Sequence, residues 1–337
     1  MNNTETKYTQ FALAREMLQT ADVVRNFDVK AIDEVVANLK DKVLLSGEGS
    51  SRIFPAKNTL YRANKKGYAQ RIFTEGATQA LEYKLDDATV FVASNSGKTK
   101  EGVRLIRKLK AEGHKSIVGI VAHEGTPIVA EADYGYVLTC GNEDAVAATK
   151  SVVEQALFTD LVFRKANGSR MPDLKKLGDA IEEVLTMKVP EEIVSALANA
   201  PVLYWAGRNN GVAEELRLKT NEITRKKSDY LEGTYAAHGI EEVMRANEAI
   251  IVVDPFEQEE EKFDTCLRKG VGLPIVAISI RKTSFPTMII PDVGCPSMET
   301  YVQLCAGWSL LMEVGLANNI NLDKPERARK VGNEFVG

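Results

Sequence analysis

Short apolar runs alternate with amphipathic stretches along the first half of the chain. Five apolar or β-branched runs predict buried strands: Val43–Leu45, Gln70–Phe73, Thr89–Ala93, Ile117–Val121 and Tyr134–Leu138. Apolar residues at helical spacing predict helices at Tyr8–Asn26, Ala31–Leu39, Glu101–Lys110 and Ala145–Phe163. A further helix is predicted to follow the Ser46–Arg52 turn and to end at about Asn64. Strands that alternate with helices in this way predict an α/β fold, with a parallel sheet covered by helices on both faces.

The same alternation returns in the second half, after the connector Lys165–Pro172. The predicted strands there are Val202–Ala206, Ile250–Val253, Ile275–Ile278 and Thr287–Ile290. The predicted helices are Asp173–Lys188, Val212–Thr224, Gln258–Arg268 and Pro296–Leu316. We therefore predict two similar α/β halves in tandem, one over residues 1–167 with the N-terminal helices and one over residues 168–337 with the C-terminal tail.

The turn after the third predicted strand has the composition of an anion site. Ser94–Thr99 (SNSGKT) joins that strand directly to a helix. Such a turn leaves backbone N–H groups at the helix start, where the helix dipole adds positive potential. Ser94, Ser96 and Thr99 add hydroxyl donors without adding charge, which suits a phosphate monoester. An ordinary helix N-cap at Ser96 or Thr99 is the alternative interpretation.

The matching turn of the second half differs in charge. By order along the chain, Ser94–Thr99 corresponds to Asp254–Gln258, and Gly47–Arg52 corresponds to Gly207–Gly211. Asp254–Gln258 is acidic and contains a proline, so we expect it to repel a phosphate. The pattern therefore predicts one main phosphate site for the pair of halves.

Size and composition limit the class of protein. The 337 residues suffice for two domains, and no apolar run approaches the length of a membrane span. The N-terminus shows no signal peptide, and the net charge of −4 argues against nucleic acid as the main partner. Cys140, Cys266, Cys295 and Cys305 lack metal-ligand spacing, so we expect four buried thiols in a reducing cytoplasm. We expect neither a metal ion nor a cofactor.

Several stretches occur together in the order found in one family. The stretches of the first half are Gly47–Ser51, Ser94–Thr99 and Val146–Ser151. They resemble the sugar isomerase (SIS) domain family, most closely the isomerase half of glutamine–fructose-6-phosphate aminotransferase. Leu218–Thr224 and Tyr235–Gly239 are similar to that enzyme's lysine–glutamate helix and histidine–glycine segment, and Asp323–Val331 to its C-terminal lysine segment. The resemblance implies two tandem SIS domains, each a doubly wound, flavodoxin-like parallel sheet flanked by helices.

The resemblance also implies a site for a phosphorylated sugar or amino sugar. The residues that would bind this substrate are Ser50, Ser51, Ser94, Asn95, Ser96, Thr99, Val146, Ala148 and Lys150. Within this set, Ser94, Ser96 and Thr99 would hold the phosphate, and the others would line the pocket and its rim.

The resemblance implies a second set of residues for the chemistry: Glu222, His238, Lys219 and Lys330. Glu222 would move a proton between C1 and C2 of the open-chain sugar. His238 would open the ring and would reach the site of a neighbouring subunit, which implies a homodimer or a larger homo-oligomer. Lys219 and Lys330 would serve the open-chain sugar.

Elementary chemistry fits these roles. A partly desolvated carboxylate can carry a proton between adjacent carbons, and a histidine with an ordinary pKa can open a ring. A lysine can stabilise an enediolate or form an imine. Lys219 and Glu222 are three residues apart on a predicted helix and share a face, although a plain solvated face remains possible there. A structural role is the alternative for His238, and we expect His114 and His123 to be surface or loop residues.

Together with these features, the resemblance implies a cytoplasmic sugar-phosphate isomerase or deaminase. The favoured reaction converts glucosamine-6-phosphate to fructose-6-phosphate and ammonia, because no glutaminase segment is visible that could draw ammonia from glutamine. The alternatives are a deglycase for fructosamine-6-phosphates and a sugar-phosphate-binding regulator without turnover. No basic DNA-binding helix-turn-helix is visible at either end of the sequence.

Overall fold

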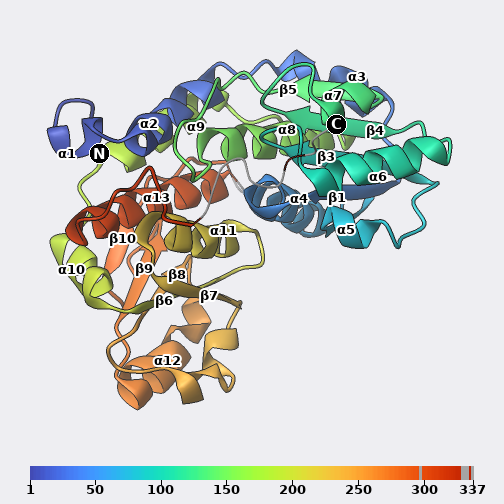
Figure 1. Cartoon of the computed structure of the whole chain (residues 1–337). Helices are drawn as coiled ribbons and strands as arrows, with labels where there is room; N and C mark the ends of the chain where they lie inside the picture. Colours follow the sequence, from blue (N-terminus) through green and yellow to red (C-terminus); the bar gives the residue numbers. More distant parts are fainter. Residues whose placement is uncertain (296–297, 328–333, 335–337) are drawn as a thin grey trace. The chain divides into compact units, whose positions relative to one another are not determined.

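The computed structural model describes residues 1–295, 298–327 and 334 (Figure 1). The described residues form two five-stranded parallel sheets. The first has the order β2-β1-β3-β4-β5, with β1 (Lys42–Gly47), β2 (Arg71–Glu75), β3 (Ala88–Ser94), β4 (Ile117–Val121) and β5 (Tyr134–Val137). The second has the order β10-β9-β8-β6-β7, with β6 (Val202–Gly207), β7 (Lys227–Glu232), β8 (Ala249–Val253), β9 (Ile275–Ser279) and β10 (Thr287–Ile289). Numbered within each sheet, the two orders are the same.

The chain divides into two compact units, each built on one sheet. The first-sheet unit comprises Asp22–Glu143, Ala148–Leu174 and, from the C-terminal segment, Glu334. The second-sheet unit comprises Met1–Ala21, Asp144–Ala147 and the described part of Lys175–Ala328.

This division differs from the predicted one, in which residues 1–167 form the first domain. Met1–Ala21 pack within the second-sheet unit, and the first-sheet unit continues to Leu174. The Tyr8 hydroxyl donates to the Glu313 carboxylate at 2.5 Å. The backbone N–H groups of Ala12 and Leu13 donate to the two oxygens of Asp323, each at 2.8 Å. These bonds link the N-terminal residues to residues about three hundred positions later, a pairing that no local sequence pattern shows.

Helices cover both faces of the first sheet. The α-helices of this unit are α3 (Asp33–Ala37), α4 (Ile53–Lys66), α5 (Ala77–Ala80), α6 (Lys100–Ala111), α7 (Pro127–Glu131) and α8 (Lys150–Ala166). On one face, Val103 of α6 lies in a buried cluster with Val90 and Val92 of β3. Phe91 points to the other face and packs on Phe163 of α8, with ring centroids 6.1 Å apart. Burial of both faces explains why the inner strands β1, β3 and β4 are mainly apolar runs in the sequence.

The second sheet is covered in the same manner. The α-helices of its unit are α1 (Thr6–Thr9), α2 (Ala12–Arg25, ending in the first-sheet unit), α9 (Leu174–Thr186), α10 (Glu191–Asn199), α11 (Val212–Lys219), α12 (Glu260–Phe263) and α13 (Glu299–Ala317). Helices α11 and α13 pack closely, because a Cβ on Gly307 would lie 2.3 Å from the Leu216 side chain. Trp205 of β6 points to their face and donates to Thr220 at 2.7 Å. Neighbouring Ala206 joins a buried cluster with Leu267 on the other face.

Some predictions of the sequence pattern are wrong. The pattern predicts no strand at β7, whose charged residues alternate in exposure along an edge strand, and no helix at α10. The helix predicted from Ala145 begins at Lys150. Cys140 and Cys305 are buried as expected, but Cys266 and Cys295 are half-buried, and all four are free thiols.

Candidate functional site

The Ser94–Thr99 turn lies at the carboxyl end of β3 and leads into α6. Gly97 has φ +66°, and a Cβ there would lie 2.0 Å from Thr126 Oγ1, so the turn requires a glycine at this position. Glu334 pairs with Thr99 in an isolated antiparallel bridge. The C-terminal part of the chain therefore reaches this turn.

The hydroxyl groups of the turn form a connected set. Ser94 Oγ lies 2.8 Å from Thr99 Oγ1 and 3.5 Å from Ser96 Oγ. Ser94 Oγ accepts from the Gly97 N–H at 3.0 Å, and Ser96 Oγ accepts from the Lys98 N–H at 3.2 Å. Thr99 occupies the N-cap position of α6, but its side chain makes no capping hydrogen bond. The ordinary N-cap interpretation therefore does not account for Thr99.

A second turn meets this one at the end of β1. Gly47 ends β1 beside Ala93 of β3 and precedes the 3₁₀ turn Gly49–Ser51. A Cβ on Gly47 would lie 2.8 Å from the Ala93 carbonyl oxygen and 3.3 Å from the Ser51 carbonyl oxygen. The glycine thus permits both turns to approach the strand ends closely. Ser50 and Ser51 follow β1 while Ser94–Thr99 follow β3, adjacent strands at the carboxyl edge where open parallel sheets bind ligands.

Asn95 is held by Glu143, a residue that no motif in the sequence marks. Asn95 Nδ2 donates to Glu143 Oε2 at 3.2 Å. The other Glu143 oxygen accepts from the Thr149 N–H at 2.8 Å, and Ser151 Oγ donates to Oε2 at 2.6 Å. Buried Glu143 therefore ties the β3 turn to the start of α8, whose first residue is the buried Lys150. No spacing rule could reveal Glu143, because Asn95 lies 48 residues away in the chain.

Val146 and Ala148 belong to different compact units. Ala148 and Lys150 lie in the first-sheet unit with the two turns, whereas Val146 lies in the second-sheet unit. There the Val146 N–H donates to the Asp323 carbonyl at 3.3 Å. Glu16 accepts from the N–H of the preceding Asp144 at 2.5 Å.

The predicted acid–base pair lies in the second-sheet unit. Lys219 ends α11, and Glu222 lies in the π-helical turn Thr220–Thr224 that follows. Lys219 Nζ is 2.7 Å from Glu222 Oε2 and 3.3 Å from Glu215 Oε1. The side chains of Lys219 and Glu215 are fully buried, while that of Glu222 is 21% exposed. The solvated-face alternative is therefore wrong for Lys219, and Glu222 is the member of the trio that solvent or a ligand can reach.

The charge of Lys219 follows from its neighbours. Burial alone would lower the pKa of the Lys219 ammonium, but the carboxylates of Glu222 and Glu215 outweigh burial and hold that pKa above its ordinary value. A lysine that stays protonated can stabilise a developing negative charge, whereas imine formation needs the free amine. The geometry therefore favours the electrostatic role for Lys219.

The three histidines differ in their surroundings. His238 is exposed, and its Nε2 lies 2.9 Å from Lys262 Nζ and 3.2 Å from Thr234 Oγ1. His123 is exposed as expected. His114 lies in the loop between α6 and β4, as expected, but not at the surface: it is buried, with Nε2 3.1 Å from the Leu85 carbonyl, and burial lowers its pKa. Lys330 lies outside the described residues.

The matching turn of the second sheet is not simply acidic. Asp254, with φ +47°, follows β8, and its carboxylate pairs with Arg208 Nη1 at 2.6 Å. The Arg208 guanidinium also stacks 4.1 Å from the ring centroid of Phe256. In the strand orders of the two sheets, β8 corresponds to β3 and β6 corresponds to β1. The turns Asp254–Gln258 and Gly207–Gly211 therefore follow the strands that the predicted correspondence requires. The positive charge of Arg208 offsets the negative charge of Asp254. The turn is therefore less repulsive to phosphate than its acidic residues alone suggest.

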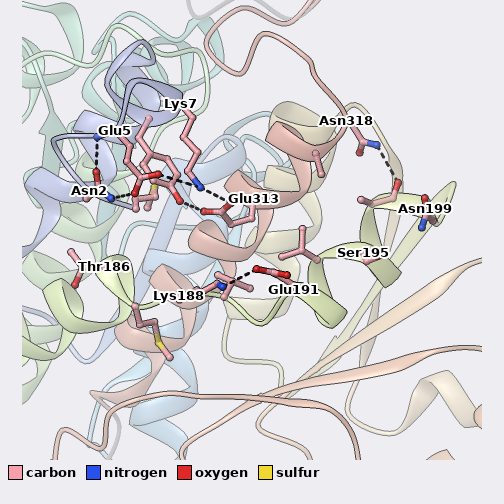
Figure 2. Close-up of a pocket in the computed structure, with 17 residues that line it drawn as sticks. Asn2, Glu5, Lys7, Thr186, Lys188, Glu191, Ser195, Asn199, Glu313 and Asn318 are labelled. Carbon is pink, nitrogen blue, oxygen red and sulfur yellow. Dashed lines mark hydrogen bonds and ion pairs between the residues drawn. The ribbon is translucent and has the colours of Figure 1, made fainter.

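A large cleft of the second-sheet unit contains none of the predicted site residues. It has a volume of about 730 Å³ and lies between the N-terminal residues, α10 and the end of α13. Figure 2 shows that its charged side chains pair with one another, as Lys188 does with Glu191 and Lys7 with Glu313. Size alone therefore does not identify it as the substrate site.

Comparisons with known proteins identify the domain that carries the two turns. Residues 39–165 match the SIS domain family. A glutamine–fructose-6-phosphate aminotransferase of Sulfolobus acidocaldarius is 21% identical over 316 residues, which cover 90% of this chain and 52% of that enzyme. The chain spans about half the length of the curated relatives it matches.

Solved structures share the fold. The C-terminal domain of the aminotransferase from Francisella tularensis has a TM-score of 0.76 at 16% identity, covering 96% of this chain and all of that domain. A glucosamine-6-phosphate deaminase from Thermotoga maritima has a TM-score of 0.70 at 18% identity, covering 94% and 98% of the two chains. No helix among the described residues is both long and apolar enough to cross a bilayer. Residues 39–165 are therefore a SIS domain, in a chain related to the glutamine–fructose-6-phosphate aminotransferases.

Proposed function

We propose that the Ser94–Thr99 turn binds the phosphate of a sugar phosphate. The observation that carries this proposal is the connected set of Ser94, Ser96 and Thr99 hydroxyls at the start of α6. A helix N-terminus and neutral hydroxyl donors can bind a phosphate dianion. Ser50, Ser51, Asn95, Ala148 and Lys150 would complete the site within the first-sheet unit, and Val146 is assigned by resemblance alone.

The proposed reaction is the deamination of glucosamine-6-phosphate to fructose-6-phosphate. His238 opens the ring, and Glu222 then removes the proton from C2 and returns it to C1, with protonated Lys219 stabilising the charge that develops on oxygen. The resulting C2 imine adds water and releases ammonia, which leaves the ketone. The aminotransferase and deaminase names of similar proteins support this substrate class.

We also propose that the second sheet belongs to a second SIS domain in tandem with the first. Its support is the shared strand order of the two sheets, which is that of flavodoxin-like folds. The proposed assembly is a homodimer in the cytoplasm, with His238 serving a neighbouring subunit. Sedimentation of the full chain would test the oligomeric state.

Two assays test the reaction: ammonia release from a panel of amino-sugar phosphates, and release of the free amino acid from glycated amino acid phosphates. We expect turnover of glucosamine-6-phosphate, loss of turnover with retained binding in Glu222→Gln, and little change in Glu214→Gln, which alters a neighbouring carboxylate of α11. Turnover of only the glycated substrates would instead establish a deglycase. Binding without turnover of any substrate would establish a binding protein.

Calorimetric titration tests the phosphate site separately. We expect Ser94→Ala/Thr99→Val to weaken glucosamine-6-phosphate binding about tenfold or more, since a hydrogen bond to a charged group contributes roughly 1.5–3 kcal/mol. The matched control Thr186→Val/Ser195→Ala removes two hydroxyls from the large cleft of the second-sheet unit. Weakened binding in the control alone would indicate that the sugar phosphate binds in that cleft and not at the Ser94–Thr99 turn.

A further inference from the structure

A small cavity lies beneath the Ser50–Ser51 turn, inside the first-sheet unit. Ser46 of β1, Ser51 and Gln155 of α8 line it, together with apolar side chains such as Phe91 and Ile120. Ser46 is 3% exposed and Gln155 is 1% exposed. Among the described residues, Ser46 Oγ and both polar atoms of the Gln155 amide have no hydrogen-bond partner. Two residues that line this cavity therefore carry three polar atoms without partners.

Buried polar atoms in folded proteins nearly always have a partner, either in the protein or in an ordered water molecule. The neighbouring Thr159 hydroxyl has a single proton, which is directed at the carbonyls of Gln155 and Ala156, each at 3.0 Å, so that proton is not free for Ser46 Oγ or the Gln155 amide oxygen. The cavity leaves about 10 Å³ open to the centre of a water molecule. That is roughly the space one water molecule needs, and a buried water typically makes about three hydrogen bonds.

We propose that Ser46 and Gln155 bind one internal water molecule and that this water positions the Ser50–Ser51 turn. Ser46 directly precedes Gly47, whose position beside the Ser51 carbonyl brings the turn against the end of β1. The water fills the space between that strand end, the turn and α8. Gln155 and Ser46 are thus positioning residues, since they act on a substrate through Ser51. This last step rests on the proposed function.

The water itself is tested in the 337-residue chain without any substrate. A crystal structure at a resolution that shows ordered water should place one molecule within hydrogen-bond distance of Ser46 Oγ and the Gln155 amide. The Gln155→Met variant should lose this water while its fold is retained. A dry cavity, or a direct hydrogen bond between Ser46 and Gln155, would overturn the inference.

The positioning role is tested by titrating glucosamine-6-phosphate into the Glu222→Gln protein with and without Gln155→Met. We expect the dissociation constant to rise by about threefold to tenfold, as loss of a bridging water misplaces the turn. Gln303→Met is the matched control, because it removes a buried amide from α13 of the other unit. An equal effect of the two variants, or none from Gln155→Met, would contradict the positioning role.

Failure of the proposed function and failure of the proposed water site give different results. If the protein binds no sugar phosphate, the proposed function fails, while the water in the crystal structure still decides whether Ser46 and Gln155 form a hydration site. If sugar phosphate binds but the cavity is dry, the inference fails and the proposed function stands.

Discussion

At the scale of single residues, the unusual group is Lys219, an ammonium buried between the carboxylates of Glu215 and Glu222. Buried ion pairs are sensitive to loss of one member, because the remaining charge stays out of water without compensation. Glu222 is partly exposed and can be solvated, but Glu215 is not. The stability of this unit should therefore depend on the Lys219–Glu215 pair and its chemistry on Glu222.

We expect Lys219→Met to lower the free energy of unfolding by about 3–5 kcal/mol near neutral pH, since it leaves Glu215 buried and without its cation. Urea denaturation measures this difference. The double variant Lys219→Met/Glu215→Gln should recover part of the loss, because it removes the buried charge as well. Equal stability of the single and double variants would contradict this account.

A second residue-scale consequence concerns His114 and pH. Burial lowers the pKa of His114 below its ordinary 6.5, while the unfolded chain keeps the ordinary value. Below that value the unfolded state binds more protons than the folded state, so the contribution to stability is complete above pH 6.5 and declines as the pH falls.

We therefore expect the free energy of unfolding to fall less between pH 7 and pH 5 in His114→Asn than in the unchanged protein. Urea midpoints at the two pH values measure this slope. His123→Asn is the matched control, because it alters an exposed histidine and should leave the slope unchanged. A steep slope that survives in His114→Asn would assign the pH dependence to other groups.

At the scale of elements, the two turns at the carboxyl edge of the first sheet depend on glycines for different reasons. Gly47 allows two strand ends and a turn to meet, whereas Gly97 combines a left-handed conformation with close contact to Thr126. Gly67, at the end of α4, has the same φ of +66° but no heavy atom within 4 Å of a Cβ built there. A comparison of alanine substitutions at Gly97 and Gly67 therefore distinguishes the cost of the left-handed backbone from the cost of steric contact.

We expect Gly97→Ala to destabilise the protein more than Gly67→Ala, which should cost only about 1 kcal/mol for the conformation alone. The additional loss reflects displacement of Thr126 by the new methyl group. Gly97→Ala should also weaken glucosamine-6-phosphate binding, as the hydroxyl set is anchored on this turn. Thermal unfolding and calorimetry measure the two effects, and equal losses from both alanines would exclude the steric contribution.

At the scale of the whole molecule, the sequence pattern predicted the sheets better than the site. The apolar strands are confirmed because strands buried on both faces are apolar throughout, whereas β7 escaped detection as a charged edge strand. The turn hydroxyls could be foreseen from a local pattern at a strand end. Glu143 and Glu215 could not, because their importance comes from partners that folding brings to them.

The passage of the chain between the two units has a consequence for its synthesis. Residues 12 and 13 bond to Asp323, so the amino-terminal residues leave the ribosome long before their partner exists. During translation the amino-terminal segment lacks this partner, so part of its apolar surface stays exposed. The first sheet can already assemble at that stage. A nascent chain arrested before residue 323 should therefore hold an unfinished second unit that chaperones can recognise.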